Sequence, residues 1–255
     1  MGGNMMSKNG FRIPLILAFA FGLASSGGAA IIDLTGTIRD FKVSHPDFED
    51  FLDVDPGIVQ PVLGADKKPV YAGLAGNPTT SGQANFDQWY RDEPGVNQSQ
   101  SLTITLDDTG HPGIFTFIDN TFFPIDGQLF GNEGNSHNFH FTYEIHSQFT
   151  YQGGEVFTFT GDDDLWVFIN DGLAIDLGGV HGALTGSVDL DTLGLTPGND
   201  YDFDLFFAER HTTESQFRVD TSILLEPTPI PEPATVLLLG LGTLGLAAFR
   251  RRSRV

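Results

Sequence analysis

The chain has 255 residues, with 33 acidic and 13 basic side chains and no cysteine, and its formal net charge is −20. All the acidic residues lie between Asp33 and Glu232, where only seven basic residues occur, so this segment carries a net charge of −26. Such a surface repels phosphate backbones, which excludes nucleic acid as a partner. Without cysteine there is no disulfide, so core burial, with or without a bound metal, has to stabilise the fold.

The first 30 residues have the features of a secretory signal peptide. Lys8 and Arg12 precede an apolar run at residues 13–24, and small residues follow this run. A membrane-spanning helix needs about 20 residues, so this run of 12 predicts a cleaved signal rather than an anchor.

Residues 31–226 predict a single all-β domain. Apolar and polar residues alternate in residues 101–106, 139–145, 201–207 and 217–223, which is typical of half-buried strands. Residues 165–169 are apolar at every position and predict a central strand, with Trp166 and Phe168 in the core. We expect a β-sandwich with a few short helices, the best candidates being residues 46–51 and 86–90.

Three consecutive carboxylates precede the central strand, in the sequence GDDDLWVFINDG. Asp162, Asp163 and Asp164 would be costly to place beside a core unless something compensated their charge. A hard cation with oxygen ligands, Ca²⁺ above all, would do so. A solvated acidic turn explains the composition equally well.

Other polar clusters give weaker signals. Asp200, Asp202 and Asp204 share one face of a predicted strand, which we expect to face solvent. His140 and His146 would lie about 20 Å apart along a regular strand, too far to share a zinc ion. No catalytic motif is recognisable, so we expect a protein that is not an enzyme, although 33 carboxylates leave a glycosidase as a third candidate.

The C-terminal end predicts a linker followed by a membrane anchor. Residues 227–233 contain four prolines and form a stiff linker. Residues 234–249 carry no charge and can form a short spanning helix. Arg250, Arg251 and Arg252 would keep the C-terminal end of this sorting tail (residues 234–255) in the cytoplasm, which leaves the domain outside.

Residues 35–224 resemble the fibro-slime domain family, and the tail resembles a PEP-CTERM sorting signal. The matching domain segments are TGTIRDFKVSHPDFEDF (35–51), KKPVYAG (67–73), FDQWY (86–90), FFPIDG (122–127), HNFHFT (137–142), GDDDLWVFINDGLAIDLGGVHG (161–182) and LFFAERHTTESQF (205–217). In the tail, Pro231, Glu232 and Pro233 precede the apolar run and the arginines. The tail implies recognition by an exosortase in a two-membrane bacterium that makes exopolysaccharide.

Fibro-slime domains are in turn distantly similar to the protective-antigen-type β-sandwich, which implies a calcium site. Its sugar-binding members hold Ca²⁺ with two adjacent aspartates joined by a cis peptide, here Asp162 and Asp163, and the ion ligates sugar hydroxyls. Glu209 matches a third ligand, although those members usually carry Asn there. Asp164 is the spare carboxylate, unless the register slips by one and Asp163 pairs with Asp164. Backbone carbonyls near His211 and Thr213 would complete the shell.

The expected function is therefore that of an exported cell-surface or matrix protein that binds polysaccharide with the help of Ca²⁺. It would be anchored transiently in the inner membrane before it reaches the surface. The alternative is a structural matrix protein in which Ca²⁺ only stabilises the fold. The sequence leaves open the glycan, the oligomeric state and whether the tail is cleaved.

Overall fold

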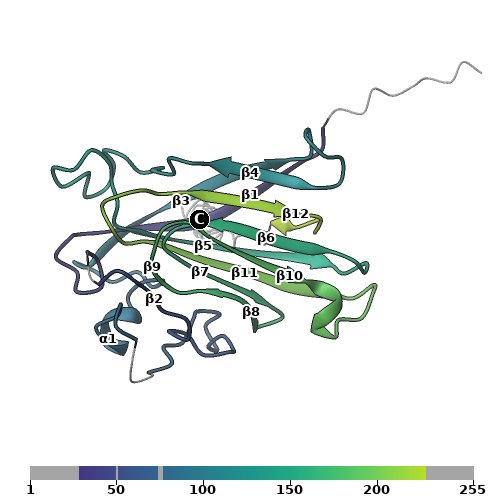
Figure 1. Cartoon of the computed structure of the whole chain (residues 1–255), viewed down its shortest axis with the longest axis horizontal. Coiled ribbons are helices and arrows are strands. Elements are labelled where there is room, and N and C mark those ends of the chain that lie inside the picture. Colours follow the sequence, from purple (N-terminus) through teal and green to yellow (C-terminus); the bar gives the residue numbers. More distant parts are fainter. Residues whose placement is uncertain (1–28, 50, 74–76, 228–255) are drawn as a thin grey trace, which may run out of the picture.

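A computed structural model describes residues 29–49, 51–73 and 77–227 (Figure 1). The predicted signal peptide up to residue 28, and the linker and tail from residue 228, lie outside the described residues. This includes Pro231, Glu232, Pro233 and the arginine cluster, so the proposed boundaries of signal, domain, linker and tail stay predictions. Within the described ranges, no helix is long and apolar enough to cross a bilayer.

The fold is all-β, as predicted, with thirteen strands, one α-helix and one 3-10 helix among the described residues. They are β1 (Ile31–Phe41), β2 (Asp53–Val54), α1 (Gln83–Phe86), β3 (Asn97–Asp107), β4 (Phe115–Asp119), β5 (Phe141–Thr150), β6 (Val156–Gly161), β7 (Asp164–Ile169), β8 (Gly172–Leu177), β9 (Gly179–Val180), β10 (Leu184–Asp189), η1 (Leu190–Leu193), β11 (Asp200–Glu209), β12 (Phe217–Thr221) and β13 (Glu226–Pro227).

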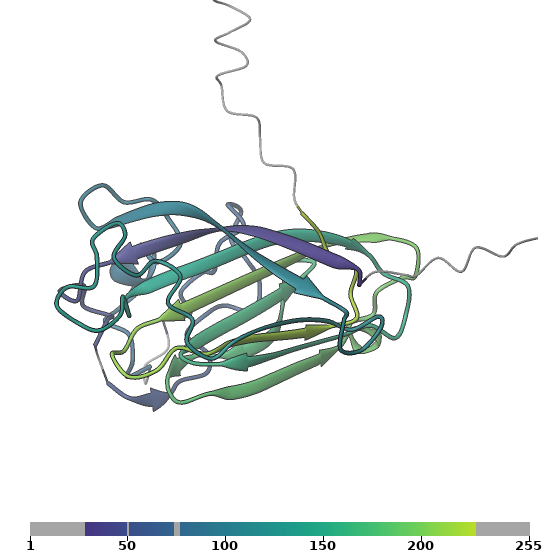
Figure 2. The ribbon, with the colours of Figure 1, turned by 90° about the horizontal axis from the view of Figure 1, so that it is seen from above.

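Eleven strands form one antiparallel sheet in the order β10-β6-β12-β4-β3-β1-β5-β11-β7-β8, with β13 paired to β5 beside this path. The sheet stays continuous at the turn between its layers, because Asp107 of β3 pairs with Thr116 of β4. β10 and β8, the first and last strands of this order, also approach each other. Gly186 of β10 lies so close to Ile175 of β8 that a Cβ on the glycine would be 2.6 Å from Ile175 Cγ2. The two layers expected of a sandwich thus belong to a single, nearly closed sheet (Figure 2).

The interior of the rolled sheet is filled by aromatic side chains. Phe157 of β6 packs on Phe203 of β11 with ring centroids 5.0 Å apart. Phe207 of β11 meets Phe217 of β12 edge to face at 5.1 Å. Such aromatic pairs add to the large apolar area that each ring buries. The alternation read from residues 201–207 and 217–223 therefore corresponds to the inward face of β11 and β12.

A second core lies on the outer face of the sheet, where residues 58–73 and 77–90 cover β7 and β11. Trp166 and Phe168 are fully buried there, which confirms their predicted place in the core. Trp166 packs on Trp89, with ring centroids 6.1 Å apart. The central strand is apolar at every position because one of its faces contacts the interior and the other contacts this covering segment. Figure 1 shows α1 and β2 on this side, near β7, β8 and β9.

The two expected helices are only partly present. Residues 42–49 form successive turns instead of a helix. Asp47 explains the difference, because its side chain accepts hydrogen bonds from Ser81 and from the Trp89 indole and so fixes this turn against the second core. The other helix exists as the short α1, which begins earlier than expected and continues as turns through residue 90.

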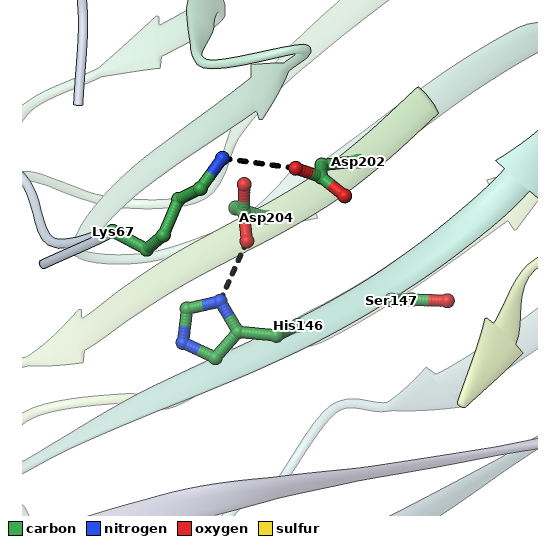
Figure 3. Close-up of a pocket in the computed structure, with 5 residues that line it drawn as sticks. All are labelled: Lys67, His146, Ser147, Asp202 and Asp204. Carbon is green, nitrogen blue, oxygen red and sulfur yellow. Dashed lines mark hydrogen bonds and ion pairs between the residues drawn. The ribbon is translucent and has the colours of Figure 1, made fainter. Parts of the chain in front are cut away.

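The expectation that Asp200, Asp202 and Asp204 face solvent is wrong for Asp204. This side chain is buried, because the covering segment lies over the outer face of β5 and β11. Its Oδ1 accepts a hydrogen bond from Nδ1 of His146 on β5, and the two atoms are 2.6 Å apart (Figure 3). The neighbouring Glu144 is buried as well and pairs with Arg39 and Lys68. Charges on this face are therefore paired rather than solvated.

His146 makes the stability of this face depend on pH. Burial lowers the pKa of His146, but contacts with Asp204 and Glu144 outweigh that effect and raise the pKa to about 9. A folded-state pKa above the unfolded value of about 6.5 contributes stability that is fully present below pH 6.5 and is lost as the pH rises through 9. The groups facing His146 are Glu144 on β5, Asp202 and Asp204 on β11, and Lys67 and Lys68 from the covering segment.

We expect the free energy of unfolding to fall between pH 6.5 and 9.5 by about 2 kcal/mol more in the wild type than in His146→Gln. The full pKa shift would correspond to a somewhat larger value, which solvent at this partly exposed side chain reduces. Urea unfolding of both proteins at the two pH values measures the difference. Parallel pH profiles of the two proteins would show that His146 does not carry this effect.

Candidate metal and ligand site

The acidic segment lies at one end of the rolled sheet. Asp162 and Asp163 connect β6 to β7, and the peptide bond between them is cis, as the family resemblance implied. Asp164 is the first residue of β7 and pairs with Ala208 of β11. This register puts Glu209, the last residue of β11, next to the aspartates. The antiparallel pairing of β7 and β11 therefore brings together carboxylates that are far apart in the chain.

Backbone amides hold two of the carboxylates in place. Asp163 accepts hydrogen bonds from the amides of His181 at 2.9 Å and Arg210 at 3.0 Å. Asp162 accepts one from the amide of Gln216 at 2.5 Å. Both aspartates are buried, with 3% and 6% of their surface exposed. The segment is therefore not the solvated acidic turn that composition alone allowed.

Asp164 belongs to a different set of contacts. Its carboxylate forms a fully buried ion pair with Arg210, with Oδ2 2.6 Å from Nε, and accepts a hydrogen bond from the amide of Gly179. Gly179 has a φ of 119°, and a Cβ there would lie 2.3 Å from the carbonyl oxygen of Asp53, so only glycine fits. With Asp164 paired to Arg210, the neighbouring Asp162 and Asp163 remain for an ion.

Glu209 is fully buried and has no cationic partner among the described residues. Its Oε1 accepts a 3.3 Å hydrogen bond from the amide of His211, whereas its Oε2 has no hydrogen-bond partner in the described part of the chain. Oδ2 of Asp162 is equally buried, and no described residue donates to it. Two buried carboxylate oxygens are thus left without a donor, an arrangement that is costly unless a proton or a cation compensates it.

The pKa values show how strongly these groups oppose ionisation. Burial, followed by the charges of Asp163 and Asp162, raises the pKa of Glu209 well above its usual range. Burial raises the pKa of Asp163 to about 8, although the nearby Arg210 guanidinium opposes this. Burial also raises the pKa of Asp162. At neutral pH the carboxyl group of Asp163 therefore holds a proton that a divalent cation would displace.

The other two expected ligands are less well placed. The carbonyl of His211 accepts the amide of Thr213 at 2.9 Å, and Thr213 itself is exposed. The His211 ring faces Glu49, with Nε2 3.6 Å from Oε2. In the described part of the chain, no three Asp, Glu or His side chains are arranged to hold a metal ion as they stand. The calcium site therefore stays a prediction, supported by the donor set and the unpartnered oxygens.

Sequence reasoning missed the residues that support the carboxylates. The most important is Arg210, whose guanidinium also donates to the carbonyl oxygens of Asp47 and Thr79 and lies 4.7 Å from the Trp89 ring. One signal was available, because Arg210 is one of only seven basic residues in a strongly acidic segment and follows Glu209 directly. The amide donors of Gly179, His181 and Gln216 had no signal, since any residue except proline supplies one.

Two family models match this chain. Residues 109–229 match the model of the PA14 domain, and residues 229–252 match the PEP-CTERM protein-sorting motif. These two matches confirm the resemblance read from the sequence. The PEP-CTERM motif indicates an exported surface protein that an exosortase processes. Neither match indicates a catalytic family.

The chain is homologous to the psi proteins of Dictyostelium discoideum. It is 40% identical to psiR over 83% of this chain and 23% of psiR, and 42% identical to psiD over 78% of this chain and 43% of psiD. The chain thus spans less than half the length of these relatives. Among solved structures it is similar to a PA14 sugar-binding domain from an RTX adhesin, with 9% identity, a TM-score of 0.33 and coverage of 76% of this chain and 95% of that one.

A second solved structure is the epithelial adhesin 9 to 1 A domain from Candida glabrata in complex with beta-lactose. Its identity to this chain is 16%, its TM-score is 0.34, and the match covers 80% of this chain and 84% of that chain.

Proposed function

We propose that this domain binds polysaccharide at the cell surface or in the extracellular matrix through Ca²⁺ held by Asp162, Asp163 and Glu209. The observation that carries the calcium part is the pair of buried carboxylate oxygens without partners, one on Asp162 and one on Glu209. Bound calcium would supply a positive charge to oxygens that otherwise repel one another. The PA14 family match supports the glycan part.

The residues of the chain have distinct parts in this proposal. The amides of His181, Arg210 and Gln216 orient the aspartates, and the ion pair with Arg210 keeps Asp164 away from the metal. Asp163 releases a proton when calcium binds. The peptide oxygens near His211 and Thr213 complete the oxygen ligands. Hydroxyl groups of a sugar would occupy the remaining positions of the ion.

A second candidate function has a specific observation in its favour. Glu209 is fully buried, and Asp162 and Asp163 are nearly so. An ion enclosed to this degree can stabilise the end of the sheet without reaching a glycan. The domain would then be a structural part of the matrix, and Glu209 in place of the usual Asn of sugar-binding members agrees with that role.

Binding to an array of bacterial exopolysaccharides, in calcium and in EDTA, separates the two functions. We expect the wild type to bind at least one glycan in calcium, and Glu209→Gln and EDTA to abolish that binding. The control is Asp191→Asn, which changes a carboxylate at a distance from the site. Calcium stabilisation without binding of any glycan would favour the structural role.

We also propose that residues 234–249 hold the precursor in the inner membrane until the exosortase acts on Pro231, Glu232 and Pro233. The arginine cluster that follows supports a cytoplasmic end. Cell fractionation with an epitope placed before Pro227 tests the order of events. Recovery of the full-length protein from the cytoplasm, with its signal intact, would contradict it.

A further inference from the structure

A pocket lies on the outer face of β5 and β11, away from the acidic end of the sheet. It has a volume of about 220 Å³ and is lined by Lys67, His146, Ser147, Asp202 and Asp204 (Figure 3). Asp204 and Glu209 are both on β11, about 17 Å apart along the strand, and their side chains point to opposite faces. The pocket is therefore separate from the proposed calcium site.

The deepest group in the pocket is a carboxylate with one unused oxygen. Asp204 is only 3% exposed, and its Oδ1 is 2.6 Å from His146 Nδ1. Its Oδ2 is buried and has no hydrogen-bond partner within residues 29–49, 51–73 and 77–227. In Figure 3 this second oxygen points away from His146, towards the side on which Lys67 and Asp202 lie. A buried acceptor without a donor calls for a ligand or a water that supplies one.

One donor of the pocket has a hydrogen to spare. The Lys67 ammonium lies 2.5 Å from Asp171 Oδ1 and 2.9 Å from Asp202 Oδ2, which leaves its third hydrogen free among the described residues. His146 is occupied on both sides, because its Nδ1 contacts Asp204 and its Nε2 lies 3.6 Å from Glu144 Oε2. The pocket thus offers one free acceptor, Asp204 Oδ2, and one free donor, the Lys67 ammonium.

This pattern selects the chemistry of the ligand. An anion would meet the carboxylates of Asp202 and Asp204, and a cation would meet Lys67 and the imidazolium of His146. A hydroxyl group donates and accepts at once, so it satisfies the free oxygen of Asp204 or the ammonium of Lys67 without adding charge. Vicinal hydroxyls on one ring would use Asp204 and Lys67 together.

The size of the pocket suits one ring. A protein cavity of about 150 Å³ holds benzene, so a volume of about 220 Å³ accommodates one substituted six-membered ring. The backbone that carries the lysine is fixed in a tight turn, because Lys67 has a φ of 58°, the amide of Gly64 donates to the carbonyl oxygen of Lys68, and the amide of Lys67 donates to that of Gly64. The side chains of Lys67 and Asp202 are partly exposed, so the pocket opens to solvent beside them.

The pocket is not a hydrolase site, despite the presence of serine, histidine and aspartate. Ser147 lies on the opposite face of β5 from His146, and its hydroxyl donates to the carbonyl oxygen of Glu226 on β13. Figure 3 shows its side chain pointing away from the imidazole. His146 therefore has no nucleophile to activate.

We propose that this pocket binds a single neutral polyhydroxylated ring, such as one sugar unit or a cyclitol, through Asp204 and Lys67, which His146 and Asp202 hold in place, and without a metal ion. The proposal does not rest on the calcium site. A polysaccharide with such a unit in a branch or at its end would contact the domain at two separate places.

NMR titration of the purified protein in EDTA tests the proposal, with methyl α-glucoside, methyl α-galactoside, methyl α-mannoside and myo-inositol as probes. The ring C–H signals of His146, assigned with His146→Gln, report the pocket. We expect at least one probe to shift these signals with a millimolar dissociation constant. Because EDTA removes calcium, binding under these conditions separates this pocket from the proposed calcium site.

Asp202→Asn and Asp204→Asn should each weaken binding up to about tenfold, because Asp204→Asn replaces the oxygen that accepts from the ligand and Asp202→Asn removes the charge that holds the Lys67 ammonium in the pocket. Asp200→Asn is the matched control, because Asp200 lies on the same face of β11 outside the pocket and pairs with Thr150. Asp202 is the safer variant, as its side chain is partly exposed and its loss should leave folding intact. No shift at His146 with any of the four probes, or equal affinity in Asp200→Asn and Asp202→Asn, would overturn the proposal.

Discussion

Calcium at a hundredfold excess over its dissociation constant is expected to raise the melting temperature of the wild type by about 5–10 °C. An ion that binds only the folded state at that excess stabilises it by about 2.7 kcal/mol, and a domain of this size gains about 2–4 °C for each kcal/mol. Asp163→Ala should show no such shift, because it removes a carboxylate that two backbone amides orient. Differential scanning calorimetry in calcium and in EDTA measures both proteins.

Two further variants make this result interpretable. Glu209→Gln keeps the shape of a fully buried side chain and should reduce the calcium response even if Asp163→Ala folds poorly. Asp200→Ala removes an exposed carboxylate of the same strand and should respond like the wild type. An equal response of the wild type and Glu209→Gln, or no response of the wild type to millimolar calcium, would contradict the proposed site.

Replacement of Arg210 by methionine is expected to lower the free energy of unfolding by about 3–5 kcal/mol, because it leaves the charge of Asp164 buried without its partner. Arg210 and Asp164 are both fully buried, with 2.6 Å between Nε and Oδ2. The guanidinium also joins the segments around Asp47 and Thr79 to the end of the sheet. Urea unfolding at neutral pH measures the loss.

The chain contains a matched control for this prediction. Arg218 and Asp220 form an ion pair with the same 2.6 Å distance between the same atom types, but both side chains are partly exposed. Arg218→Met should cost less than about 1 kcal/mol, as exposed ion pairs do. If the two variants lost equal stability, burial would not explain the contribution of Arg210. Combining Arg210→Met with Asp164→Leu should recover much of the loss, since an apolar pair leaves no buried charge.

The class of fold and the position of the acidic site could be predicted from the order of residues in the chain. Alternation at period two identified the strands, because one face of each strand contacts an apolar core and the other does not. The uninterrupted apolar run of residues 165–169 identified the strand that is buried on both sides. Three consecutive carboxylates next to this strand marked a place where negative charge needs compensation. That inference depends only on neighbouring residues in the sequence and not on contacts with distant ones.

Which partners these charges have depends on the tertiary structure. Arg210 pairs with Asp164, 46 residues earlier, and His146 pairs with Asp204, 58 residues later. The register of β5 and β11 sets His146 opposite Asp204, and that of β7 and β11 sets Asp164 opposite Ala208, two residues before Arg210. Register depends on the packing of the whole sheet, and a shift of one residue would turn every side chain to the other face. The burial of Asp204 depends in addition on the segment that carries Lys67, whose path over the sheet follows from contacts around Trp89 and Trp166. Periodicity within a single strand contains no information about what covers its outer face, so Asp204 could not be distinguished from the exposed Asp200.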